Sequence, residues 1–181
     1  MKAMLVAVAA VAVLTINGRT VAAQALPSKP GPEHEKLGYF VGKWKTEGTV
    51  QPGPMGKGGK TTSNDDCQWF EGKFTVICHY EGTTPNGPSK SIGLLGYSME
   101  DKAYTYYGID NSAMTMASVP KGHVQGDTWT YTDESTMGGK PMKTRVVIKE
   151  VSPTSYTFKM DFQGPDGKWI PAMESTSTRV K

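Results

Sequence analysis

The sequence predicts an all-β domain, built either as a sandwich or as a barrel, and three observations support this fold class. The stretches between turns are rich in β-branched and aromatic residues, which favour strands. The chain has 181 residues with 21 glycines and 12 prolines, which suits one domain with many short strands. Turn signals recur at separations of about 8–16 residues, and they include Gly72-Lys73, Pro85-Asn86-Gly87-Pro88, Gly138-Gly139 and Asp166-Gly167.

Residues 1–23 are typical of a signal peptide. A positive residue follows the first methionine, and residues 3–16 are apolar with one exception. This run is shorter than the ~20 residues that a membrane span needs. A buried core helix is the alternative, but nothing else in the chain resembles its helical partner. We therefore expect cleavage after Ala23 or Ala25, a periplasmic or secreted protein, no membrane span, and a single domain over residues 24–181.

The positive charge of the chain lies partly in this leader. The whole chain carries a formal charge of +3, but the leader holds two basic residues and no acidic one, which leaves 18 basic and 17 acidic residues in the body. We therefore expect no nucleic-acid partner, because a nearly neutral body offers no basic surface to phosphates. Outside the leader the hydrophobic fraction falls from 37% to about 32%, which is low for the core of a large α/β enzyme.

Only one segment of the body has a helical pattern. Residues 32–41 begin with a proline, which suits the first turn of a helix, and Glu33 and Glu35 are favourable near the helix N-terminus. The Gly/Pro-rich stretch 51–60 is expected to be a loop. Its end is similar to a phosphate-binding loop, but Pro54 stands where that motif needs glycine, and the flanking strand and helix are missing.

The two cysteines, Cys67 and Cys78, flank a predicted β-hairpin. If Gly72-Lys73 forms a two-residue turn, the antiparallel register places 67 opposite 78, and a four-residue loop over 71–74 gives the same pairing. Opposed Cα atoms lie ~4.5–5.5 Å apart, which is within the range of a disulfide. An oxidising compartment favours the bond. Neither cysteine belongs to a C-x-x-C pair, so we expect a structural role.

Strand periodicity is clearest near the C-terminus. Between Tyr156 and Gln163, apolar and polar residues alternate, which puts the apolar side chains on one face. Counting such segments gives about ten strands after one short helix. Smaller examples of the alternation are Tyr104/Tyr106, Met114/Met116 and Trp129/Tyr131.

Two further residues carry a resemblance. Gly42-Lys43-Trp44 opens the first strand directly after the helix, and Arg179 lies on the last strand. This pattern is similar to that of the calycins, the lipocalins and their relatives, in which a G-x-W tryptophan closes the barrel base and an arginine from the terminal strand packs across it. A cation over an indole face contributes ~0.5–2 kcal/mol. The resemblance implies an all-β, lipocalin-like (calycin) antiparallel barrel in which Trp44 and Arg179 are structural.

A second resemblance covers nearly the whole body. The chain resembles the exported proteins of domain-of-unknown-function family 1579 at residues 30–37 and 41–44, at 67–72 with Cys78, at 93–97 and at 169–179. Where that family reads Gly-Tyr-Asp, this chain has Gly96-Tyr97-Ser98, so the acid is absent. The resemblance implies a lipocalin-like barrel and an exported protein, and it implies no reaction.

Three histidines could take part in acid–base or metal chemistry, but none has a ligand-spaced partner. We expect His34 to be a solvated helix residue and His79 to pack across strands on the face opposite Cys78. His123, just after the Lys121-Gly122 turn at the barrel rim, is the best-placed candidate for proton transfer or metal binding. No histidine follows it, which disfavours haem held by a late histidine, as in the nitrobindin-like calycins. We expect no cofactor and no metal.

Two carboxylate pairs, Asp65-Asp66 and Asp133-Glu134, are of the kind that acid–base catalysis uses. Adjacent residues on a strand face opposite sides, so neither pair is a natural dyad. We expect both pairs in turns or on the surface. Asp133 remains a weak candidate, beside His123, for a reaction at the rim.

The aromatic content suggests the function. The chain holds four Trp, eight Tyr and five Phe, and inward-facing aromatics of a barrel either fill its core or line a cavity for an apolar ligand. The first hypothesis is a non-catalytic binder of a small apolar ligand, monomeric or a weak homodimer. The alternatives are a small exported enzyme with its site at the rim, and an envelope or stress protein that acts by protein contact. We expect the binding site to be lined by some of Tyr97, Tyr106, Met116, Trp129 and Phe158.

Overall fold

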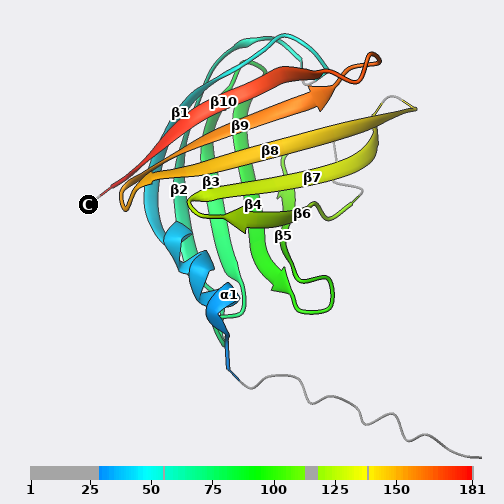
Figure 1. Cartoon of the computed structure of the whole chain (residues 1–181). Helices are drawn as coiled ribbons and strands as arrows, with labels where there is room; N and C mark the ends of the chain where they lie inside the picture. Colours follow the sequence, from blue (N-terminus) through cyan, green and yellow to red (C-terminus); the bar gives the residue numbers. More distant parts are fainter. Residues whose placement is uncertain (1–28, 55, 113–117, 138, 181) are drawn as a thin grey trace, which may run out of the picture.

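The structure, a computed structural model, describes residues 29–54, 56–112, 118–137 and 139–180. Its strands form one closed antiparallel barrel that follows a short helix (Figure 1). The helix α1 spans Pro32–Lys36, and a 3₁₀ turn follows at Leu37–Phe40. The strands are β1 (Gly42–Val50), β2 (Gly59–Trp69), β3 (Val76–Thr84), β4 (Gly87–Ser98), β5 (Ala103–Asp110), β6 (Lys121–Gln125), β7 (Thr128–Met137), β8 (Lys140–Ser152), β9 (Ser155–Gln163) and β10 (Trp169–Arg179). The predicted barrel of about ten strands with one short N-terminal helix is confirmed.

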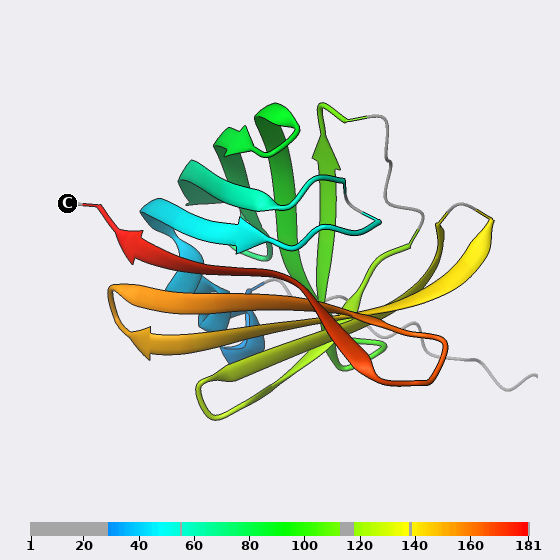
Figure 2. The ribbon, with the colours of Figure 1, turned by 90° about the horizontal axis from the view of Figure 1, so that it is seen from above.

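The barrel closes because the first and last strands pair with each other. Every other strand pairs with its neighbour in sequence, so the chain runs up and down around the barrel, which Figure 2 shows from above. In the closing register Trp44 on β1 lies opposite Arg179 on β10. On its other side Trp44 lies opposite Asp65 on β2. These pairings place Trp44 of the first strand between Arg179 of the last strand and the acidic residue Asp65.

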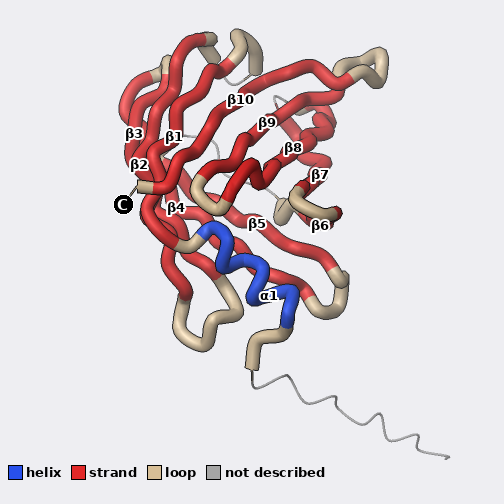
Figure 3. The backbone as a smooth tube through the Cα atoms, turned by 60° about the vertical axis from the view of Figure 1, so that its left-hand side comes forward, coloured by secondary structure: helices blue, strands red, loops and turns tan. Residues whose placement is uncertain are grey.

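The helix lies at one end of the barrel, which we call the base (Figures 1 and 3). Leu37 and Phe40 of the 3₁₀ turn are buried there against the barrel core. The α-helix is shorter than the predicted 32–41, because the chain tightens into this turn and then enters β1 at Gly42. Gly42 has φ of +129°, and an added Cβ would meet the guanidinium of Arg179.

The cysteine hairpin has the predicted register. Cys67 on β2 lies opposite Cys78 on β3, and the two form a disulfide with Cα atoms 4.0 Å apart. The turn is at the predicted place, and both Gly72 and Lys73 have positive φ, 83° and 59°. The register therefore follows from the turn, as expected for a hairpin.

The interior changes character with distance from the base. Near the base, aromatic side chains are packed and buried, and Trp44 and Trp129 are almost inaccessible. Further from the base, Phe158 and Met160 on β9 are inward-facing and only half-buried. In a closed barrel an inward side chain reaches solvent through the interior, so this exposure indicates room there. Several inward positions of β1–β5 hold small residues, among them Gly48, Ser63, Gly82, Ser91 and Gly108.

Candidate ligand-binding site

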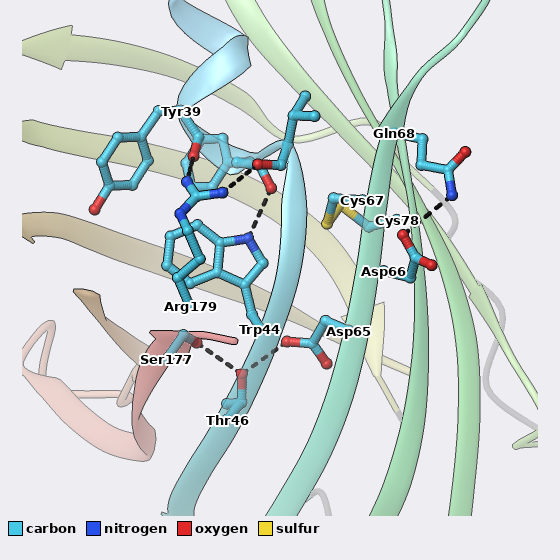
Figure 4. The surroundings of a disulfide bond; sticks show 12 residues. Tyr39, Trp44, Thr46, Asp65, Asp66, Cys67, Gln68, Cys78, Ser177 and Arg179 are labelled. Carbon is cyan, nitrogen blue, oxygen red and sulfur yellow. Dashed lines mark hydrogen bonds between the residues drawn. A yellow bond between two sulfur atoms is a disulfide. The ribbon is translucent and has the colours of Figure 1, made fainter. Parts of the chain in front are cut away.

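The base is sealed by the predicted pair of Trp44 and Arg179. The guanidinium carbon of Arg179 lies 4.1 Å from the centre of the Trp44 ring. Arg179 donates hydrogen bonds to the carbonyl oxygens of Val41 and Tyr39, and the Trp44 indole donates to the Phe40 carbonyl at 2.8 Å (Figure 4). A ligand therefore has no route through this end.

An acidic side chain lies directly above the sealed base. Asp65 faces inward from β2 and is only 4% exposed. The hydroxyl of Thr46 on β1 donates to its Oδ2 at 2.7 Å, and the hydroxyl of Ser177 on β10 lies 2.7 Å from Thr46 Oγ1 (Figure 4). Because Thr46 gives its single hydroxyl proton to the carboxylate, Ser177 is the donor in the second bond. The row of hydroxyl groups is thus directed at the carboxylate.

Two buried polar atoms in this part of the barrel lack a hydrogen-bond partner among the described residues. They are Oδ1 of Asp65 and the hydroxyl oxygen of Tyr131, whose side chain is 4% exposed. Burying a polar atom without a partner costs ~1–3 kcal/mol, and native proteins rarely tolerate it. The interior therefore offers an acceptor at Asp65 and a hydroxyl at Tyr131 to something that the chain itself does not supply.

Tyrosine rings surround the carboxyl group. Tyr80 and Tyr106 converge over Gly93, where an added Cβ would lie 2.9–3.0 Å from both rings. Tyr156 approaches from β9, with its ring centre 4.9 Å from that of Trp44. Burial raises the pKa of all three hydroxyls, and the negative charge of Asp65 adds to the effect. These phenols therefore stay neutral over the physiological range of pH.

Burial also changes the titration of Asp65 itself. Removal of the carboxylate from water raises its pKa above 3.8, and the hydrogen bonds from neighbouring hydroxyl groups act in the opposite direction. No lysine, arginine or histidine of the described chain forms an ion pair with it. An ionisable group with a perturbed pKa inside a concave interior is a typical mark of a binding site.

The residues that the sequence predicts to line the ligand site lie in two different parts of the barrel, and one lies outside the described residues. Tyr106 and Phe158 face the interior, Tyr106 beside the Asp65 carboxyl and Phe158 opposite Ser175 on β10. Tyr97 and Trp129 lie in the base. Met116 lies outside the described residues.

The two base residues are already occupied by contacts within the chain. The Trp129 ring packs against Phe40 and Tyr104 at 5.0 and 4.7 Å, and its indole donates to Glu150 at 2.7 Å. Tyr97 contacts the His34 ring. We therefore place them in the support of the site and not in its wall.

The rim candidates for catalysis do not come together. His123 is exposed, and it lies opposite Thr130 in the β6–β7 pairing, so its side chain faces outward. Asp133 is half-buried and shares the inner face with Tyr131, where it accepts a hydrogen bond from Ser118 at 2.6 Å. The barrel wall thus separates the two side chains.

Two expectations about single residues are wrong. His34 is buried, not solvated: it is 5% exposed, because its ring packs edge-on against Phe74 and Tyr97. Asp65 lies neither in a turn nor on the surface, because it is part of β2 and faces the interior. A signal for Asp65 exists in the sequence, since strand alternation puts it on the same face as Cys67. Asp66 faces outward, so the two carboxyl groups form no dyad, as expected.

Hollows also occur on the outer face. The larger one, about 710 Å³, crosses β1–β5 and is lined mainly by exposed side chains such as Lys43, His79 and Lys90. Another, about 410 Å³, lies beside His123. Charged groups there are solvated or paired, as Lys90 is with Glu81 at 2.7 Å. The lining of the larger hollow also includes Trp44, Asp65 and Tyr80, whereas the smaller one is lined by no buried residue.

In the described part of the chain, no three histidine, cysteine, aspartate or glutamate side chains lie close enough together to hold a metal ion. Among the same residues there is no helix with the length and apolar character of a membrane span.

Known structures share this fold at low sequence identity. The S-type phycobiliprotein lyase CPES from Guillardia theta has a TM-score of 0.55 and 16% identity, over 82% of this chain and 93% of that one. Rv2717c from M. tuberculosis has a TM-score of 0.59 and 12% identity, over 83% and 99%. A redesigned β-barrel, mFAP0, bound to DFHBI matches with a TM-score of 0.41 and 18% identity, over 78% and 99%. No curated protein sequence matches the chain.

The sequence itself matches a protein family. The profile described as "Protein of unknown function (DUF1579)" covers residues 29–179, which is nearly the whole described barrel. The two similar structures with the higher TM-scores share the fold of this matched region. The chain therefore belongs to the DUF1579 family.

Proposed function

We propose that this barrel binds a small, largely apolar molecule in its interior and catalyses no reaction. The observation that carries the proposal is the pair of buried polar atoms, Asp65 Oδ1 and the Tyr131 hydroxyl oxygen, that the described chain leaves without partners. The inner face of β9 adds the half-buried apolar side chains of Phe158 and Met160 to the same interior. A concave, mostly apolar wall with a few fixed polar groups is the usual composition of a small-molecule site.

A neutral environment-sensitive dye, 1-N-phenylnaphthylamine, tests this proposal. We expect its fluorescence to saturate at one site per chain, and we expect the bound dye to raise the melting temperature, because a ligand of the folded state stabilises it by mass action. The matched variants are Thr157→Ala, which alters the half-buried position beside Phe158, and Phe158→Ala, which alters the interior wall. Dye affinity should fall only in Phe158→Ala. Absence of a saturable site in the wild type would contradict the proposal.

We also propose that the protein is exported. The leader over residues 1–23 and the Cys67–Cys78 disulfide support this, since stable disulfides belong to oxidising compartments. Intact-mass measurement on protein from the periplasm and the medium should show a chain that begins after Ala23 or Ala25. A full-length chain found in the cytoplasm would contradict export, and this result would leave the binding proposal untouched.

A further inference from the structure

Asp65 has the most buried acidic side chain of the described barrel, and no cationic side chain of the described residues forms an ion pair with it. Asp161 shows the contrast: its side chain is 14% exposed, and it pairs with Arg145 at 2.6 Å. Asp65 is 4% exposed, and among the described residues only hydroxyl groups form side-chain hydrogen bonds with its carboxylate. A buried carboxylate is normally retained with a charge partner, because desolvation alone penalises the ion by several kcal/mol. The missing partner of Asp65 is therefore expected to be a cation from outside the chain.

The hydrogen bonds around Asp65 favour its ionised form. Ser177 donates to Thr46, and Thr46 donates to Oδ2, so both bonds support negative charge on the carboxylate. Oδ1 remains available to a second donor. A charged N–H donor to a carboxylate forms one of the stronger hydrogen bonds in proteins.

Above the base, the inner faces of the described strands carry two carboxylates besides that of Asp65. Asp133 shares the inner face of β7 with Tyr131, and Asp110 shares that of β5 with Tyr106. Alternation along the described strands puts one lysine on an inner face, Lys140, which is exposed where β8 begins. Arg179, the arginine at the base, is already engaged by Trp44 and backbone carbonyls. This field attracts a cation into the barrel and repels an anion.

The rings of Tyr80, Tyr106 and Tyr156 complete the environment. An organic cation gains ~0.5–2 kcal/mol from each aromatic face it meets, and most where water is excluded. Buried phenols that stay neutral keep this property across the physiological range of pH.

We propose that the ligand is a small organic ammonium ion, a protonated amine on an apolar body, whose N–H group binds Asp65 Oδ1 among the tyrosine rings. This inference rests on the proposed function and names its ligand class. The apolar body would lie along Phe158 and Met160, away from the sealed base.

The test compares two probes that differ in the head group alone. Tryptamine and tryptophol share an indole body, and one ends in an ammonium ion and the other in a hydroxyl group. Direct calorimetry and displacement of 1-N-phenylnaphthylamine should both show tryptamine binding at least tenfold more tightly at pH 7. A smaller pair, 2-phenylethylamine and 2-phenylethanol, applies the same comparison to a shorter body.

Matched variants assign the preference to Asp65. Asp65→Asn keeps the shape and removes the charge, so it should abolish the amine preference by weakening tryptamine binding at least tenfold. Asp66→Asn makes the same change on the next residue, which faces outward and accepts a hydrogen bond from Gln68, and it should keep the preference (Figure 4).

A pH series needs no variant. The ammonium group stays protonated below about pH 10, so tryptamine binding should weaken as the pH falls from 7 to 4 and Asp65 takes up a proton. The facing groups Tyr80, Tyr106, Tyr131 and Tyr156 have raised pKa values and stay neutral over this range. Arg179 faces Trp44 at the base. Asp110 and Asp133 also face the interior, and Asp65→Asn separates their contribution, because it should remove most of the pH dependence.

The failures are distinguishable. If dye binds but the amine and the alcohol displace it equally, and Asp65→Asn changes neither, then a neutral donor or water serves Oδ1. That result overturns the inference and leaves the proposed function standing, as does failure of both probe pairs to displace the dye. If neither the dye nor any indole probe binds, the proposed function and the inference both fail.

Discussion

Asp65 places a carboxyl group inside a barrel whose neighbouring inward side chains are aromatic rings and hydroxyl groups. The group is buried and lacks a cation among the described residues, so its charged form is less stable in the fold than in the unfolded chain. Proteins retain such groups chiefly where function needs them, at the expense of stability. This argument links the carboxyl group to binding and has a direct consequence for stability.

The stability of the protein should depend on the ionisation of Asp65. The folded state holds the proton more tightly than the unfolded state, so the free energy of unfolding falls as the pH rises from about 3.8 through the folded-state pKa. Without ligand, Asp65→Asn should therefore unfold at a higher urea concentration than the wild type at pH 7, and the gap should narrow toward pH 4. Asp66→Asn is the control and should show no such pH-dependent gap. A gap that widens toward pH 4 would contradict the argument.

Arg179 stabilises the base through both its charge and its shape. Arg179→Ala removes the stacking on Trp44 and the hydrogen bonds to Tyr39 O and Val41 O. We expect the free energy of unfolding to fall by about 1–3 kcal/mol, measured by urea denaturation. Arg179→Lys keeps the charge but loses the planar fork, so it should recover only part of the loss. Unfolding at the wild-type urea concentration would show that the closure is unimportant.

At the scale of elements, the β2–β3 hairpin combines a turn, a register and a covalent bond that agree with one another. Cys67 and Cys78 are 11 residues apart, so their bond closes a short loop. For such a loop the bond adds ~2–3 kcal/mol at most, and less where the hairpin already forms in the unfolded chain. The ladder of β1–β2–β3 is expected to hold the hairpin in place without it.

Reduction of the disulfide should therefore lower the melting temperature without unfolding the barrel. Protein that is unfolded, reduced and refolded in reductant should keep its near-UV circular dichroism at 25 °C and melt below the oxidised form. Re-oxidised protein, carried through the same steps, is the control. Two reactive thiols in freshly purified protein would show that the bond is absent, and loss of the fold on reduction would show that the ladder does not suffice.

The predictability of each element depends on how local its determinants are. The hairpin register and the inward face of Tyr156 to Gln163 follow from turn residues and alternation, which lie within a few residues of one another. The burial of His34 depends on Phe74 and Tyr97, about 40 and 60 residues away, and no local pattern contains them. Asp65 is predictable in part. Its inward orientation follows from strand alternation with Cys67, but the lack of a hydrogen-bond partner for its Oδ1 depends on the closed barrel.

At the scale of the whole molecule, the barrel has two parts with different tasks. The base is packed around Trp44 and Trp129, closed by the helix and sealed by Arg179. The interior above it has small residues on β1–β5, half-buried apolar side chains on β9 and the carboxyl group of Asp65. Stability is therefore expected to come mainly from the base, and binding from the interior.

Truncation of one aromatic residue in each part tests this division. Trp129→Ala would leave a void in the packed base, and we expect a loss of ~3–5 kcal/mol in the free energy of unfolding. Phe158→Ala removes a half-buried ring from the interior wall, so it should cost clearly less stability and weaken 1-N-phenylnaphthylamine binding several-fold. Urea denaturation and dye titration on the same samples measure both quantities, and Asp66→Asn serves as the unaffected reference. If Phe158→Ala destabilises as strongly as Trp129→Ala and no dye site exists, the interior is packed throughout, because only a filled core would make the two rings equivalent.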